Sequence, residues 1–337
     1  MKLTSFQQRK ALYRKRELTM SKKYDYVVSP RDDRDYVLKA SQDVAANVSN
    51  ASMISENYNL GAFKLPVNRM ESQGALGSCT GFGVTTAYER LVSVLTKVDS
   101  FQASPMFNYS NSRILDAETL DVDEGTTLRS ACGNLRLLGI CRDTTWPYTF
   151  ANASVTPSSE AYEEARRLAQ TINYFEVRRT LEVLKMIIGG YGYYVTIGFL
   201  VYPGFESQAA RTTGDVPDPG TGDSAIGGHC VNLYGWDDTT RRFSFINQYG
   251  ETYGQKGTGT ISYDYILNNA LTPEVKVLLP TSDFVNKIDD FMFDASKKKK
   301  PDDSLLQIFV VLLIVTLLMA GIVYYYLRSR RSRPNHG

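Results

Sequence analysis

The amino-acid sequence predicts an α+β protein whose two lobes enclose a cleft. Helical patterns occupy the first part of the folded region, and short apolar strands separated by Gly, Asp and Pro turns occupy the second part. At 337 residues the chain is long enough for two lobes with a substantial core. We therefore expect a folded domain at residues 63–285, divided into a mainly helical lobe (63–190) and a mainly β lobe (191–285).

The helices of the first lobe are predicted from apolar residues that recur every three or four positions. The clearest pattern places Tyr88, Leu91 and Leu95 on one face, which predicts a helix over residues 79–98 with Cys79 at its start. Further helices are expected at residues 127–138, 159–171 and 180–188.

The strands of the second lobe are predicted from short runs of β-branched and aromatic residues between turn residues. They are expected at residues 193–200, 230–236, 242–247, 257–263 and 274–279. A Gly- and Pro-rich segment, residues 210–228, precedes His229 and is long enough to form a rim of the cleft.

The two ends of the chain differ in character from the domain. Residues 1–62 are polar and charged, and their basic start lacks the apolar core of a signal peptide. We expect them to form an extended arm or pro-like region with patches of order. Residues 286–304 are predicted to be a charged linker and residues 328–337 a basic tail.

Residues 305–327, between the linker and the tail, predict a single transmembrane helix. These 23 almost unbroken apolar residues would span roughly 34 Å as a helix, more than a hydrocarbon core of about 30 Å. We therefore expect a C-terminal anchor that contacts lipid in a host or virion membrane. Because the start of the chain does not resemble a signal peptide, the folded domain is expected on the cytosolic side.

Charge and histidine content limit the possible functions. Lys+Arg number 38 and Asp+Glu 36, and the basic residues form short terminal runs, so no nucleic-acid partner is expected. Of the two histidines, only His229 lies in the folded domain, and a His/Cys metal site would lack ligands at useful spacing. The four cysteines, Cys79, Cys132, Cys141 and Cys230, are expected to be reduced thiols.

Cys79 is a candidate nucleophile because the positive end of a helix favours a thiolate. The side-chain amide of Gln73, six residues upstream, can be aimed at the same point as the backbone N–H of Cys79. Two such donors would form an oxyanion hole for a tetrahedral intermediate. Considered alone, Cys79 is equally consistent with a small buried core residue.

His229 and Asn247 are the candidate partners of that nucleophile. Gly228 precedes His229, and glycine permits the close backbone approach that a cleft wall needs. A lone histidine is more often structural, but a cysteine nucleophile needs an imidazole and the domain has no other. Asn247 ends a predicted strand, where it can accept the second imidazole N–H or act as a plain turn residue.

In this order, the motifs resemble those of the papain family of cysteine peptidases: Gln73, the Gly77-Ser78-Cys79 run, Gly228-His229 and the Asn247-Gln248-Tyr249-Gly250 run. The resemblance covers residues 65–279 and is closest to the shorter members found in bacteria and in large DNA viruses, including insect iridoviruses. It implies a papain-like fold with an antiparallel, barrel-like second lobe. It also implies polypeptide substrates and no cofactor.

The same resemblance implies roles for individual residues. Cys79 would be the nucleophile, His229 the base and Asn247 the third group, with Gln73 in the oxyanion hole. Three residues would contact substrate or shape its site: Gly228, Tyr249, which packs as an aromatic lid over the His–Asn pair, and Cys230, which borders the pocket for the second residue on the acyl side.

Some positions depart from the family pattern. Thr80 replaces the tryptophan that follows the nucleophile, and Leu76 replaces a cysteine, so the disulfide of that cysteine cannot form. The N-terminal arm is too short for the long helical propeptide of cathepsins. We interpret these departures as differences of lineage, because Gln73, Cys79 and the two partners of the nucleophile are all present.

Three functions remain open from the sequence. The first is a membrane-anchored endopeptidase, which requires the Cys79 thiol to be accessible and to approach the imidazole across a groove. The second is a catalytically inactive structural or binding protein on the same fold. The third is a transglutaminase-like transferase, although its third residue is typically Asp, and Asn247 fits the peptidase better.

Overall fold

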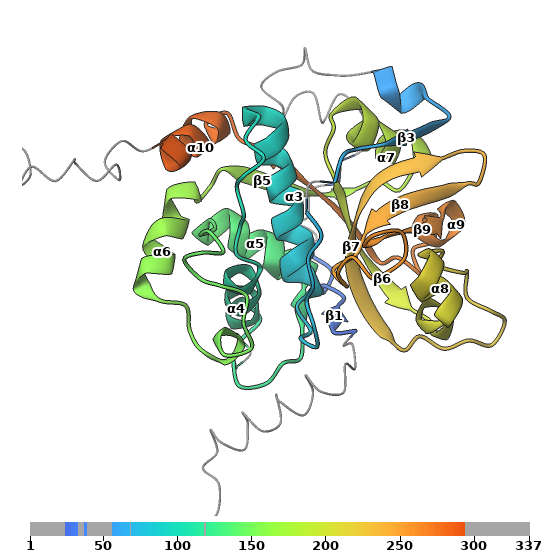
Figure 1. Ribbon diagram of the computed structural model, residues 1–337, viewed down its shortest axis with the longest axis horizontal. Helices are drawn as coiled ribbons and strands as arrows, with labels where there is room; N and C mark the ends of the chain where they lie inside the picture. Colours follow the sequence, from blue (N-terminus) through green and yellow to red (C-terminus); the bar gives the residue numbers. More distant parts are fainter. Residues whose placement is uncertain (1–23, 33–36, 39–55, 68, 118, 294–337) are drawn as a thin grey trace, which may run out of the picture. The chain divides into compact units, whose positions relative to one another are not determined.

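The computed structural model of the chain, shown in Figure 1, describes residues 24–32, 37–38, 56–67, 69–117 and 119–293. The first lobe consists mainly of helices. They are α3 (Cys79–Thr96), α4 (Pro105–Leu115), α5 (Leu128–Leu138), α6 (Ser159–Ala165) and α10 (Phe284–Phe293). The hydroxyls of Ser104, Thr127 and Ser158 cap α4, α5 and α6 by accepting backbone N–H bonds.

The second lobe contains a mixed sheet in the order β2-β5-β10-β6-β7-β8-β9, and β3 also pairs with β7. All of these pairings are antiparallel except that of β2 with β5. The strands are β2 (Val37–Leu38), β3 (Ala62–Lys64), β5 (Ile172–Val177), β6 (Val195–Val201), β7 (Gly227–Asp237), β8 (Arg242–Ile246), β9 (Thr258–Ser262) and β10 (Glu274–Pro280).

Short helices connect these elements. The α-helical ones are α7 (Leu181–Lys185), α8 (Gln208–Thr213) and α9 (Tyr263–Leu267). A π-helical turn (Met186–Gly190) continues α7, and 3-10 turns occur at Glu56–Asn59, Asn152–Ser154, Arg166–Leu168 and Pro203–Glu206.

Helix α3 lies between helices α4, α5 and α6 and the sheet (Figure 1). Its contact with β7 is close: a Cβ atom added to Gly83 would lie 2.7 Å from the sulfur of Cys230. The start of α3 therefore faces the strand that carries His229, as the two-lobe prediction requires.

The predicted α+β arrangement is confirmed, with helices followed by an antiparallel sheet. Each predicted strand is present within three residues at either end, and α3 and α5 match their predicted ranges closely. The predicted helix at 159–171 is shorter, because Gln170 has a positive φ of 59° and β5 begins two residues later.

Helix α4 was not predicted, and its burial explains why. Every residue from Pro105 to Arg113 is buried, including four polar residues at positions 108, 110, 111 and 112. The side chains of Asn108, Asn111 and Ser112 bond within the fold; Asn108, for example, donates to the carbonyl of Ala131 at 3.0 Å. A helix buried on all sides with polar residues has no apolar stripe to detect.

The predicted linker at 286–304 is helical in its described part. Residues 286–293 belong to α10, whose Phe284, Ile288 and Phe291 are buried. The rings of Phe284 and Phe291 pack on the first lobe, with Phe284 lying 5.7 Å from Tyr88 between ring centroids. This apolar spacing lies among acidic residues and was missed for that reason.

The predicted transmembrane segment (305–327) and basic tail (328–337) lie outside the described residues. Within the described part of the chain, no helix combines the length and the apolar character needed to cross a bilayer.

Candidate active site

Cys79 is the first residue of α3, and its sulfur faces β7. The N-cap residue Ser78 makes no side-chain bond to the helix N–H groups, so the positive end of α3 is not screened by a cap. The sulfur of Cys79 accepts a hydrogen bond from the backbone N–H of Cys230. That nitrogen is bonded directly to the carbonyl carbon of His229, so the thiol lies beside the residue that carries the imidazole.

His229 and Asn247 are hydrogen-bonded at 2.9 Å through Nε2 and Oδ1. The backbone N–H of Gln248 also donates to Oδ1 at 2.9 Å, which identifies that atom as the oxygen. Nε2 must then carry the proton, and in the neutral ring Nδ1 is the basic nitrogen. The tautomer is therefore the one in which Nδ1 can take a proton from a thiol.

Aromatic side chains surround the imidazole. The ring of Tyr249 lies 5.1 Å from that of His229 at an interplanar angle of 31°, which matches the lid expected from the sequence. Phe199 and Phe205 lie 5.7 Å and 5.8 Å from the same ring. Such packing excludes water from the His–Asn hydrogen bond and holds the ring plane.

Gln73 lies in the turn before α3. Its Nε2 donates to the carbonyl of Leu76 at 2.7 Å, and its backbone N–H donates to the carbonyl of Gln248 at 2.9 Å. A carboxamide nitrogen has two hydrogens, so the bond to Leu76 leaves one for an oxyanion. The turn that carries Gln73 is thus tied to the loop that carries Asn247.

Gln248 is a site residue to which the sequence assigned no role beyond its place in the Asn247–Gly250 run. Its side-chain amide donates to the carbonyl of Cys230 at 2.7 Å and to the carbonyl of Cys79 at 3.2 Å. It therefore connects the start of α3 to β7. The sequence carries no local signal for this role, because both acceptors are backbone atoms distant along the chain.

The predicted substrate residues Gly228 and Cys230 flank His229 on β7. The backbone N–H of Gly228 donates to the carbonyl of Tyr24 at 3.1 Å, and a Cβ atom on Gly228 would lie 2.5 Å from the carbonyl oxygen of Tyr26. Only glycine permits this approach, in agreement with the close backbone contact expected at this position. Cys230 is buried with its sulfur against α3.

The N-terminal segment 24–28 covers the candidate nucleophile. Its strand β1 (Tyr26–Val27) pairs in parallel with β4 (Thr126–Thr127) of the helical lobe, and Asp25 forms a bridge to Gly228 of the other lobe. Figure 1 shows β1 between the two lobes. The ring of Tyr24 lies 6.0 Å from that of His229, and both His229 and Cys79 are 0% exposed.

The covered thiol is held in its protonated form. Burial raises the pKa of Cys79 to about 12; the Asp25 carboxylate adds to this effect, and the backbone N–H of Cys230 opposes it. The thiolate is the nucleophilic form, so the described state is unreactive. The sequence predicted an accessible thiol, whereas the structure shows Cys79 buried beneath segment 24–28.

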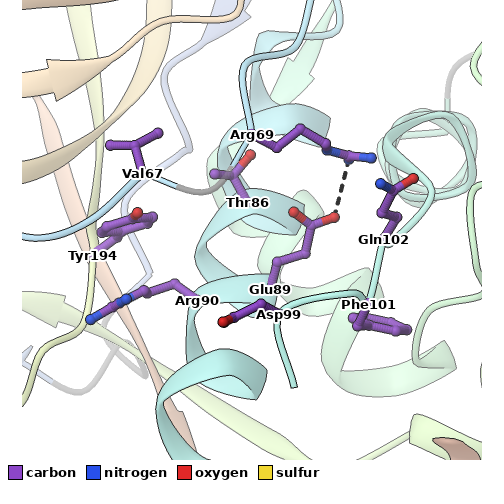
Figure 2. Close-up of a pocket in the computed structure, with 9 residues that line it drawn as sticks. All are labelled: Val67, Arg69, Thr86, Glu89, Arg90, Asp99, Phe101, Gln102 and Tyr194. Carbon is purple, nitrogen blue, oxygen red and sulfur yellow. Dashed lines mark hydrogen bonds and ion pairs between the residues drawn. The ribbon is translucent and has the colours of Figure 1, made fainter. Parts of the chain in front are cut away.

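A separate pocket of about 170 Å³ lies on another face of α3, as Figure 2 shows, and contains none of the predicted site residues. Arg69 at its edge pairs with both Glu89 and Glu71. One guanidinium cannot neutralise two buried carboxylates, and burial raises the pKa of both. We assign this cluster to the packing of α3, because its donors and acceptors bond to one another.

All four cysteines lie in the described part of the chain, where they form no disulfide and are buried. Burial raises the pKa of Cys141, as it does that of Cys79. Cys79 is therefore distinguished from the other cysteines by its position, at the start of a helix and beside His229. Its thiol is not reactive in this state.

Comparison with known proteins identifies a relative of the chain in sequence. No protein-family model matches the chain. It is 27% identical over 287 residues to an uncharacterized peptidase C1-like protein of Acanthamoeba polyphaga mimivirus, a match that covers 80% of this chain and 91% of that protein.

Two solved structures share the fold. Xylellain, a cysteine protease from Xylella fastidiosa, superposes with a TM-score of 0.66 at 26% identity, covering 77% of this chain and 96% of that one. A procathepsin B from Trypanosoma congolense gives a TM-score of 0.56 at 12% identity, over 77% of this chain and 88% of that one, and supports the fold alone.

Proposed function

Because this chain is homologous to papain-like cysteine proteases, we propose that it is a thiol-dependent endopeptidase with Cys79, His229 and Asn247 as its triad. One observation carries the proposal. The His229–Asn247 bond orients the imidazole with Nδ1 as the base, and the Cys79 sulfur lies against the next residue of the same strand.

The proposed reaction proceeds through an acyl-enzyme. His229 Nδ1 takes the thiol proton, and the Cys79 sulfur attacks the peptide carbonyl carbon. The oxyanion accepts hydrogen bonds from the backbone N–H of Cys79 and from Nε2 of Gln73. The imidazolium then protonates the leaving amine, and water, deprotonated by His229, hydrolyses the thioester and regenerates the thiol.

Catalysis requires segment 24–28 to leave the site. Its departure removes the burial and the Asp25 charge that hold the thiol protonated. It also frees the backbone of Gly228, where an extended polypeptide substrate can then bind. The proposal requires no cofactor, metal or nucleic acid.

We also propose that residues 305–327 anchor the protein in a host or virion membrane with the catalytic domain on the cytosolic side. The support is the length and apolar character of that run. Membrane fractions should retain the chain after carbonate washing. Protease added outside sealed vesicles should digest the domain, and protection of the domain would refute the proposed side.

The complete burial of Cys79 favours one alternative, a binding protein that keeps the fold without the activity. The two functions are separated by a peptide-epoxide reagent and a peptide-hydrolysis assay, each applied to the chain with and without residues 1–28. We expect the chain without residues 1–28 to hydrolyse peptide and to be labelled at Cys79, and we expect Cys79→Ala to abolish both. The control Cys132→Ala, at another buried thiol, should leave both unchanged. Absence of hydrolysis by the shortened, folded chain would refute the endopeptidase.

A further inference from the structure

Tyr26 of the covering segment fills an enclosed recess in the sheet. The side chain is buried, and Cβ atoms added to Gly198 and Gly228 would lie 2.2 Å and 2.7 Å from its ring. Because any larger residue at these positions would displace the ring, the two glycines define walls shaped for a planar side chain. The hydroxyl of Tyr26 donates to Oε2 of Glu274 on β10 at 2.7 Å.

The recess is next to the candidate nucleophile. Gly198 of β6 pairs with Cys230 of β7 in the sheet register, and Gly228 is two residues before it. The Cys230 sulfur is close enough to contribute to the raised pKa of Tyr26, after burial and Glu274. An extended chain that crosses Cys79 can therefore place one side chain in this recess, as the covering segment does.

Glu274 gives the recess a buried acceptor at its end. Oε2 accepts the Tyr26 hydroxyl and the backbone N–H of Ser29 at 2.9 Å, so one donor belongs to the covering segment and the other to the residue that directly follows it. Oε1 lies 3.5 Å from the ammonium of Lys276, which also pairs with Glu176 at 3.1 Å. When the segment leaves, Oε2 loses the Tyr26 hydroxyl, and an incoming hydroxyl can replace it.

We propose that this recess is a tyrosine-selective substrate subsite and that Glu274 is its specificity-determining residue. The inference rests on the proposed endopeptidase function. Phenylalanine would fill the same space but would not replace the hydroxyl donor to Oε2 of Glu274, and sites of this kind reject the analogue that lacks the hydroxyl. A basic side chain would be repelled by the Lys276 ammonium, which lies 3.5 Å from Oε1 of this carboxylate.

The test measures binding in the full chain, so it does not depend on catalysis. Cys79→Ala prevents turnover and Tyr26→Ala empties the recess. N-acetyl-tyrosinamide, N-acetyl-phenylalaninamide and N-acetyl-argininamide are then titrated by calorimetry. We expect the tyrosine amide to bind about 10- to 100-fold more tightly than the phenylalanine amide, as expected for a hydrogen bond to a buried charge.

Glu274→Gln, which keeps the shape, should reduce that ratio to below about 5-fold. Glu176→Gln is the matched control, because it removes the other carboxylate on Lys276 and should leave the ratio unchanged. Equal affinities for tyrosine and phenylalanine, a preference for arginine, or a preference that survives Glu274→Gln would overturn the subsite.

A second measurement does not require the emptied variant to fold. In the otherwise unaltered chain, Tyr26→Phe should increase alkylation of Cys79 by iodoacetamide about 10-fold or more, because the segment is held less tightly. In the Glu274→Gln background the same change should have less than about a 3-fold effect; equal effects in both backgrounds would overturn the subsite. A tyrosine preference in a chain that hydrolyses no peptide would instead refute the proposed function and leave the subsite standing.

Discussion

Removal of residues 1–28 should convert Cys79 from an unreactive to a reactive thiol. The segment 24–28 buries the sulfur and brings the Asp25 carboxylate to it, and the pKa of Cys79 is about 12. At pH 8 a thiol with that pKa is about 0.01% thiolate, whereas a thiol with an ordinary pKa of about 8.5 is roughly 20% thiolate. The alkylation rate should therefore rise about a thousandfold.

The matched control is a chain without residues 1–23, which keeps the covering segment. Both shortened chains are alkylated with iodoacetamide between pH 6 and pH 10, and the modified residue is located by mass spectrometry. The pH at which Cys79 becomes reactive should be lower in the chain without 1–28, because the thiolate forms at lower pH. Cys132, buried in α5, serves as the internal reference and should remain unmodified in both.

Equal rates in the two shortened chains would refute this reasoning, because the thiol would then be buried by the domain itself. A rise confined to Cys132 would indicate unfolding instead.

Three further predictions follow from contacts of the folded domain. Asn247→Ala removes the acceptor of the His229 Nε2 proton and should lower kcat about 10- to 100-fold, while Asn247→Asp, which still accepts, should lose less; equal losses would contradict the assigned tautomer. Glu89→Gln removes one of two carboxylates that share one arginine. Burial raises the pKa of Glu89, so the folded parent protein keeps a proton that the unfolded chain releases above about pH 4.5, and its stability falls as the pH rises. The variant lacks this titrating group. In thermal melts, the stability of the variant relative to the parent should therefore be roughly 2 kcal/mol higher at pH 8 than at pH 5. Gly83→Ala should destabilise the fold by about 1–3 kcal/mol, since its Cβ would lie 2.7 Å from the Cys230 sulfur, and Cys230→Ala should restore part of that loss in urea unfolding.

Local patterns were sufficient to predict most of the elements and to select the candidate site residues. The apolar spacing after Cys79 identified α3, and alternating strands identified the sheet, because both signals come from neighbours along the chain. His229 is the only histidine in the predicted domain, so the sequence also identified it as the only candidate imidazole partner for Cys79.

Long-range contacts decided the rest. The state of the nucleophile depends on Asp25, and the recess depends on Tyr26 and Glu274, which are 248 positions apart. Gln248 acts through two backbone carbonyls, which no residue pattern reveals. A sequence specifies which side chains can perform a reaction, but whether a thiol is ionised depends on what buries it. Only the tertiary structure shows that the chain's own N-terminal segment does so.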